Sequence, residues 1–283
     1  MSDDCRNETK QDYRSPNLNP DRRKAGMRVR HYDRMMPFIK KLTDPVDLLT
    51  ARGFLFEYIG GKDYRYVFEE SECKYNEGCR FSDYDDMIEL CERFMFGSFE
   101  TESGTLTITD RNIDISELRE TLFCSKMYPF LVTEYESFTN NTVSVLELEP
   151  YIARYVKTLN ACMIPTDYSC DNYNNHNNRE YAIVVRATGE VGKIFHQWVV
   201  DHYISAHIRL GWSSDRTMIQ SSSTRQEEDY YNLQLASEIL FENRSEIRNK
   251  LDESLEKLCR EGYDPYCPSD ETAAVYKKIL NLA

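Results

Sequence analysis

The chain has 283 residues and a formal net charge of -13, from 48 acidic and 35 basic side chains. A chain of this length exceeds most single domains, so two domains, or one domain with an added module, are expected. The acidic excess repels phosphates and attracts basic surfaces, and it disfavours direct binding to nucleic acid or to an anionic membrane.

The charge is unevenly distributed along the chain. Residues 1–41 carry 11 basic and 6 acidic side chains, a net of +5. Residues 69–149 carry 6 basic and 19 acidic side chains, a net of -13, which equals the imbalance of the whole molecule. The sequence therefore predicts a basic arm followed by an acidic body.

The sequence also bears on the compartment. No apolar run approaches the roughly 20 residues of a membrane-spanning helix, and residues 1–6 lack the apolar stretch of a secretory signal. These features predict a cytoplasmic protein, of the producing or of a host cell, with no membrane partner. The nine cysteines are then expected as reduced thiols, and no two of them form a Cys-x-x-Cys pair.

Composition divides the chain into four segments, and together they predict an α+β fold. Residues 1–26 are polar and lack apolar periodicity, which indicates a flexible basic arm. Residues 27–165 are expected to form an acidic α+β domain with a β-hairpin and short strands. Residues 166–180 are rich in Asn and indicate a loop or linker, and residues 181–283 are expected to form a mainly helical domain.

The strongest local signals lie early in the chain. Asp44 and Pro45 suit the N-cap and the first position of a helix. The aromatic and β-branched runs at residues 54–59 and 64–68 flank Gly60–Gly61, which predicts a β-hairpin.

A helix is predicted inside the acidic stretch, with Ser82 as its N-cap. Its apolar residues recur at helical spacing, at Met87, Ile88, Cys91 and Phe94. The acids Asp85, Asp86, Glu89 and Glu92 are expected mostly on the other face, and those nearest Ser82 would complement the helix dipole.

Weaker patterns complete the outline. Strands are expected at residues 105–109, 143–148 and 181–187, and helices at residues 116–124 and 149–159. A helix at residues 193–210 and a polar segment at residues 213–224 should precede three C-terminal helices, at residues 227–241, 245–259 and 269–282.

No pattern identifies a metal site, a cofactor site or a set of catalytic residues. His196 and His207 would share a helix face about 16 Å apart, while His202 points elsewhere, so one ion cannot bridge them. Residues 83–86 lack the spacing of a calcium loop, and residues 189–193 lack that of a phosphate loop.

Tyrosine is abundant, with 20 in the chain, and many lie among polar neighbours. Tyrosine is enriched at the hot spots of protein interfaces because it combines a broad apolar ring with a polar tip. The sequence thus predicts a partner-binding surface that combines acids with tyrosines: Asp85, Asp86, Glu89, Glu92, Tyr168, Tyr173, Tyr230 and Tyr231.

Three functional hypotheses follow. The first is a non-enzymatic interaction protein whose acidic, Tyr-bearing surface docks on a basic partner, such as a nuclease or a defence complex, as phage-encoded inhibitors and nucleic-acid mimics do. The second is an enzyme with a site assembled from distant residues around His196, Asp201 and His202. The third is a structural protein that contacts DNA through its basic arm, although that arm could equally bind the acidic body of its own or a neighbouring subunit. Homo-oligomerisation stays open.

Overall fold

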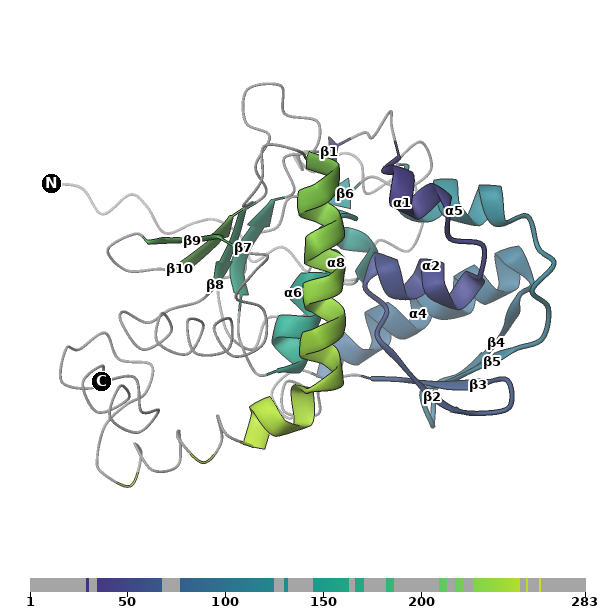
Figure 1. The fold of residues 1–283 in the computed structure, drawn as a ribbon. Helices are drawn as coiled ribbons and strands as arrows, with labels where there is room; N and C mark the ends of the chain where they lie inside the picture. Colours follow the sequence, from purple (N-terminus) through teal and green to yellow (C-terminus); the bar gives the residue numbers. More distant parts are fainter. Residues whose placement is uncertain are drawn as a thin grey trace, which may run out of the picture.

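The fold is α+β in the computed structural model, which confirms the expected class (Figure 1). The structure describes residues 29–30, 35–67, 77–124, 130–131, 145–162, 166–170, 182–185, 209–212, 217–220 and 226–249, together with residues 253 and 260.

An antiparallel sheet of four strands forms the edge of the N-terminal region, in the order β2-β3-β5-β4. Its strands are β2 (Phe56–Gly60), β3 (Asp63–Tyr66), β4 (Gly97–Glu100) and β5 (Thr105–Ile108). β2 and β3 form the predicted hairpin, and both turn glycines, Gly60 and Gly61, have positive φ angles. β5 confirms the strand expected at residues 105–109.

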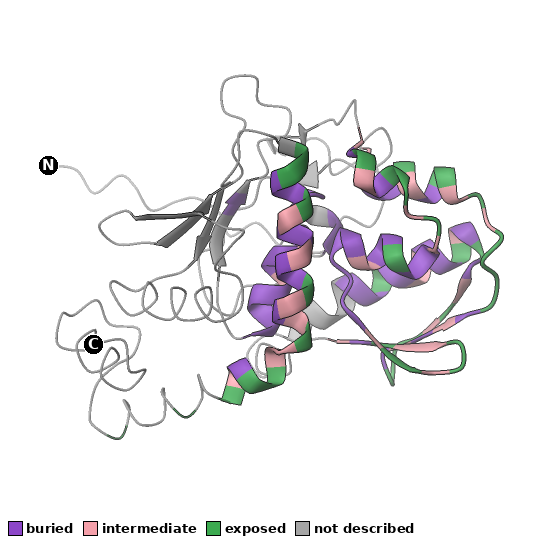
Figure 2. Cartoon of the chain, viewed as in Figure 1, coloured by how far each residue is buried: buried purple, intermediate pink, exposed green. Residues whose placement is uncertain are grey.

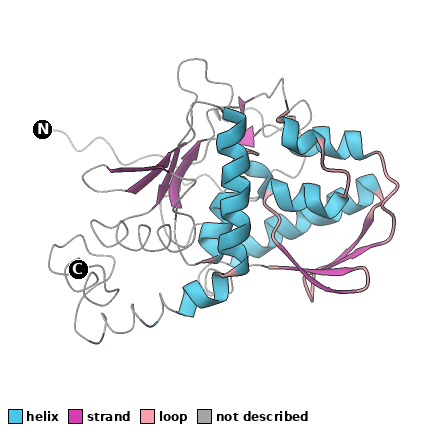
Figure 3. Cartoon of the chain, viewed as in Figure 1, coloured by secondary structure: helices cyan, strands magenta, loops and turns pink. Residues whose placement is uncertain are grey.

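Helices cover this sheet and extend away from it (Figures 1 and 3). They are α1 (Pro37–Lys40), α2 (Pro45–Arg52), α4 (Glu77–Phe94) and α5 (Ile115–Phe123). The start of α2 is as predicted, because the Asp44 side chain accepts a hydrogen bond of 2.8 Å from the Val46 N–H and Pro45 opens the helix. α5 confirms the helix expected at residues 116–124.

Two further helices lie side by side: α6 (Ala153–Ala161) and α8 (Gln226–Glu242) (Figure 1). α8 confirms the helix predicted at residues 227–241, and helical backbone continues over residues 244–249. Just beyond α8, Arg244 forms an ion pair with Glu57 of β2, which ties the end of this helical region to the hairpin.

A second antiparallel sheet of four strands has the order β7-β8-β10-β9. It consists of β7 (Thr166–Cys170), β8 (Ala182–Val185), β9 (Arg209–Trp212) and β10 (Thr217–Gln220). The short strands β1 (Val29–Arg30) and β6 (Phe130–Leu131) pair with each other. β8 confirms the strand expected at residues 181–187.

Several predicted elements are wrong because tertiary pairing overrides the local signal. Residues 166–170 form β7 and not the loop that the sequence indicates, and residues 217–220 form β10 and not a polar separating segment. Arg209 and Leu210, expected at the end of a helix, belong to β9. The rest of that helix, at residues 193–208, and the last C-terminal helix lie outside the described residues.

The helix predicted from Ser82 begins earlier, at Glu77. Ser82 therefore lies inside α4, and Asp83, Asp85 and Asp86 lie beyond its first turn, where the helix dipole has little influence. The sequence obscured this start because Gly78 disfavours a helix interior. The acids of α4 consequently need another explanation than the dipole.

The strand predicted at residues 143–148 is instead a 3-10 turn, η2 (Val145–Glu147). Among the described residues, side chains supply hydrogen-bond partners to several backbone groups of this segment. The fully buried Arg52 donates hydrogen bonds of 3.0 and 2.7 Å to the carbonyls of Leu146 and Leu148. A long-range contact of this kind leaves no periodic signal in the sequence.

One core extends through the helices and the first sheet (Figure 2). It includes Leu48 and Leu49 of α2, Leu106 of β5, Val156 of α6 and Leu233 of α8, all at most 1% exposed. Because α8 contributes to the same core as α2 and α4, the described helices of both halves of the chain are packed together.

Gly53 ends α2 at the point where α2 approaches α6. Its φ angle is 117°, and its N–H donates to the carbonyls of Leu49 and Thr50. A Cβ at this position would lie 3.0 Å from the carbonyl carbon of Ala153 and from the amide nitrogen of Arg154. The residue therefore meets both a conformational and a packing requirement.

We predict that Gly53→Ala lowers the free energy of unfolding by about 2–4 kcal/mol, since it combines backbone strain with overpacking. Gly61→Ala is the matched control, because Gly61 has a φ angle of 61° but open space around its Cβ position. It should cost only about 1 kcal/mol. Chemical denaturation measures both, and equal losses would contradict the close approach of α2 to α6.

Candidate functional site

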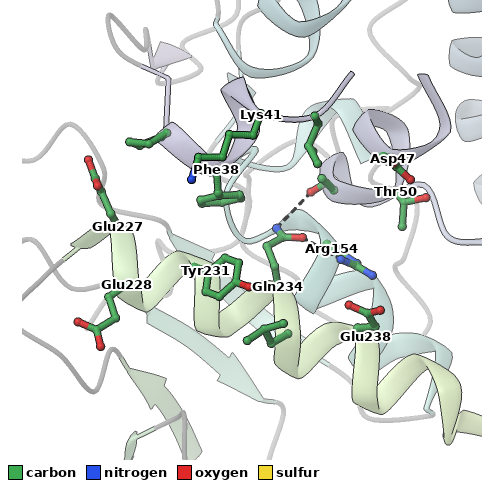
Figure 4. Close-up of a pocket in the computed structure, with 14 residues that line it drawn as sticks. Phe38, Lys41, Asp47, Thr50, Arg154, Glu227, Glu228, Tyr231, Gln234 and Glu238 are labelled. Atoms are coloured by element: carbon green, nitrogen blue, oxygen red, sulfur yellow. Dashed lines mark hydrogen bonds between the residues drawn. The ribbon is translucent and has the colours of Figure 1, made fainter. Parts of the chain in front are cut away.

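A cavity of about 820 Å³ opens between α1, α2 and α8, with α6 beneath it (Figure 4). We call it the α2–α8 groove. Its polar and aromatic lining consists of Phe38, Lys41, Asp47, Thr50, Arg154, Glu227, Glu228, Tyr231, Gln234 and Glu238. These residues come from three separate parts of the chain, namely the neighbouring helices α1 and α2, then α6, and then α8.

The sequence of α8 determines which side chains face this groove. Its buried residues recur at helical spacing, at Tyr230, Leu233, Ala236, Ser237 and Leu240. The ring of Tyr230 packs against that of Tyr151, with centroids 5.5 Å apart. With this stripe held against the core, the neighbouring stripe that contains Tyr231, Gln234 and Glu238 lines the groove.

A buried amide, that of Gln234, joins three helices at the floor of the groove. Its Nε2 donates a hydrogen bond of 3.2 Å to the carbonyl of Ala51 in α2. Its Oε1 accepts one of 3.2 Å from Nη1 of Arg154 in α6. Since both polar ends of the amide are used, the relative positions of α2, α6 and α8 are fixed at this level.

Arg154 supplies a buried positive charge at the floor. Burial lowers the pKa of its guanidinium, while the carboxylates of Glu238, Asp47 and Glu242 oppose that shift. Arginine remains protonated in proteins, so the charge persists and is balanced by these acids. The positive charge at the floor is therefore compensated by neighbouring carboxylates, and it does not form a binding site for an anion.

Tyr231 gives the groove an accessible aromatic surface. Its side chain is 49% exposed, which is unusual for a large ring on a core-packed helix. The ring of Phe38 meets it edge to face, with centroids 6.1 Å apart and an interplanar angle of 64°. This contact restrains Tyr231 from one side and leaves the rest of the ring available.

The groove lining has an excess of negative charge. Four acids, Asp47, Glu227, Glu228 and Glu238, stand against two basic residues, Lys41 and Arg154. Asp47 and Glu238 act on Arg154 at the floor, so Glu227 and Glu228 are the remaining lining acids and stand against Lys41. Such a lining attracts a cationic segment and repels an anionic one.

The acids predicted as a binding surface on α4 are only partly accessible. Asp85 and Glu92 are exposed, and Glu89 is half-buried, with its pKa raised chiefly by burial. Asp86 is only 2% exposed, so its expected place on the acidic face is wrong. Asp86 lies one turn after Asp83 and one turn before Leu90, which are both buried, so it belongs to the core-facing side of α4.

The tyrosines predicted for the binding surface also differ in their accessibility. Tyr230 is fully buried, which corrects its place on the binding surface, whereas Tyr231 lines the groove. Consecutive residues of a helix point about 100° apart, and this rotation takes the side chain of Tyr231 from the core side of α8 to the groove. Tyr168 lies in β7, but its side chain is not among those described, and Tyr173 lies outside the described residues.

Sequence reasoning missed Phe38, Arg154 and Gln234. The apolar stripe of α8 is a signal that could have separated Tyr231 and Gln234 from the core. No comparable signal marks Phe38, since α1 has only four residues, or Arg154, whose role depends on the contact between α6 and α8.

A second polar cluster, around Asp83 of α4, has the composition of a catalytic site but is a structural centre. The Asp83 carboxylate accepts hydrogen bonds of 2.7 Å from the Tyr66 hydroxyl and 2.6 Å from the Val145 N–H. It also pairs with Lys157 Nζ at 3.3 Å, and both side chains are largely buried. Burial and the Asp83 charge raise the pKa of Tyr66 well above its usual value, which keeps its hydroxyl protonated as a donor.

The Asp83 cluster does not line the α2–α8 groove. Across the described ranges, no group of three or more His, Cys, Asp or Glu side chains is arranged to hold a metal ion. His196, Asp201 and His202, which the enzyme hypothesis uses, lie outside these ranges. The α2–α8 groove is the candidate binding site that the described part of the chain offers.

Comparison of the chain with protein-family models, curated proteins and solved structures finds no match. Of the helices that the structure describes, none has the length and apolar character needed to cross a membrane.

We predict that Asp83→Ala lowers the free energy of unfolding by about 3–5 kcal/mol, because it removes one member of a buried ion pair. Asp85→Ala is the matched control, since Asp85 is on the same helix but exposed, and it should change stability by less than about 0.5 kcal/mol. Chemical denaturation measures both. Similar small losses for the two variants would show that Asp83 does not join α4 to β3 and α6.

Proposed function

We propose that the protein is a non-enzymatic interaction protein that holds a basic segment of a partner protein in the α2–α8 groove. The observation that carries this proposal is the half-exposed Tyr231, restrained by Phe38 inside a lining with excess negative charge. An accessible aromatic ring beside carboxylates is a favourable contact surface for Arg and Lys side chains.

The two parts of the groove have different roles in this proposal. Tyr231 provides contact area at a small cost in side-chain entropy, and it is the expected anchor of the interface. The rim acids Glu227 and Glu228 increase the rate of encounter with a cationic partner and select against anionic ones. The Gln234 bridge keeps the floor in place before binding, which reduces the ordering cost.

The chemistry of the groove favours a partner whose surface is itself built to bind nucleic acid. Such proteins concentrate Lys and Arg to contact phosphates. A chain with a net charge of -13 is attracted to them over a longer range than the groove alone provides. The protein would then act as an inhibitor, for example of a nuclease or a defence complex, by covering that surface, and it would need no cofactor.

We predict that Tyr231→Ala weakens binding of a fluorescent arginine-rich peptide by at least about 10-fold, the effect of removing an interface anchor. Tyr58→Ala is the matched control, because Tyr58 is 63% exposed on the hairpin and outside the groove lining. Fluorescence anisotropy with the full chain measures the affinity. Equal effects of the two variants would contradict the groove as the binding site.

The double variant Glu227→Gln and Glu228→Gln tests the rim charge with the same peptide. We expect weaker binding and a shallower dependence on salt, since fewer ion pairs form. Asp85→Asn with Glu92→Gln, two exposed acids of α4, is the charge-matched control. If the α4 variant shows the larger loss, the binding surface is the face of α4 and not the groove.

A further inference from the structure

The chain carries a basic segment whose charge matches the groove. Residues 22–30 contain five basic and no acidic side chains, at Arg22, Arg23, Lys24, Arg28 and Arg30. We propose that residues 22–28 of this segment occupy the α2–α8 groove of their own chain when no partner is bound, and so act as a built-in competitor. This inference rests on the proposed function of the groove, because it names what regulates the same site.

The position of the segment in the chain supports this occupant. The segment ends in β1, whose residues Val29 and Arg30 pair with β6. The chain then reaches Pro37 and Phe38, which line the groove. The stretch from Arg30 to Pro37 spans at most about 25 Å even when fully extended. The basic segment is therefore tethered close to the rim that it would cover.

The chemistry of the two surfaces is complementary. The groove offers carboxylates at Glu227 and Glu228 and the open ring of Tyr231. An arginine side chain can pair with a carboxylate while its planar guanidinium stacks on an aromatic ring. Arg22, Arg23 and Lys24 are consecutive, so side chains of this cluster can reach both the ring and the rim acids.

Because the basic segment is part of the same chain, weak contacts are enough for it to occupy the groove. A segment held on a short stretch of chain has an effective concentration in the millimolar range at its site. A millimolar intrinsic affinity would then fill a large part of the groove. The apparent affinity of an external ligand is its intrinsic affinity multiplied by the fraction of molecules whose groove is open. Occupancy of 90% by the arm therefore lowers the apparent affinity about 10-fold. A basic partner would thus have to bind strongly enough to displace the arm from the groove.

The first test neutralises the segment in the full chain, as Arg22→Gln, Arg23→Gln and Lys24→Gln together. We expect the arginine-rich peptide to bind about 10-fold more tightly, because the competitor is removed. The matched control neutralises three basic residues earlier in the same arm, Arg6, Lys10 and Arg14, and should leave the affinity unchanged. Equal affinities for wild type and the Arg22–Lys24 variant would overturn the inference.

The second test locates the segment directly. A photo-crosslinking p-benzoylphenylalanine at position 231 of the full chain should form crosslinks to residues 22–28, identified by mass spectrometry. The same group at position 58 should not. An equal mixture of isotopically light and heavy chains separates the two sources. Crosslinks within one chain support the inference, and crosslinks only between copies overturn it.

The two tests separate this inference from the proposed function. If the peptide binds through Tyr231 but the Arg22–Lys24 variant has no effect and position 231 does not crosslink to residues 22–28, the inference fails and the proposed function stands. If crosslinks to residues 22–28 form but the peptide binds to no variant, the groove is a site for the arm alone, and the proposed function fails.

Discussion

The carboxylate of Asp83 is the interaction on which the rest of the described fold depends. It contacts Tyr66 of β3, the backbone at Val145 and Lys157 of α6, and it projects from α4. Four parts of the chain therefore meet at one buried charge. Such a buried charge fixes the relative positions of the segments that contact it, because any arrangement that leaves the charge unpaired is strongly unfavourable.

α6 transmits this constraint to the groove. One turn before Lys157, Arg154 of the same helix donates to the Gln234 amide, which in turn donates to Ala51 of α2. The groove is therefore built on a helix that the Asp83 centre holds in place, and Gly53 lets α2 approach that helix closely. With the floor fixed, the accessible features are Tyr231 and the rim acids, which gives the groove the character of a binding surface more than of a reaction centre.

Sequence reasoning found the features that depend on local chemistry. The Asp44–Pro45 helix start, the Gly60–Gly61 hairpin and the periodic helix that became α8 are all determined by residues within a few positions of each other. Sequence reasoning failed where contacts between residues far apart in the chain determine the local structure. Arg52 of α2 donates hydrogen bonds to the carbonyls of Leu146 and Leu148, and the packing of α4 against the core buries Asp86. The groove could be predicted only through Tyr231, because its other contacts join helices from separate parts of the chain.

Hydrogen exchange in the presence of the arginine-rich peptide shows whether the α2–α8 groove is the surface that binds a basic segment. The Arg22–Lys24 glutamine variant is the suitable sample, since its arm no longer competes. The account predicts new protection of backbone amides at residues 37–51 and 226–238 and no change along α4. Protection along α4 with none at the groove would contradict it.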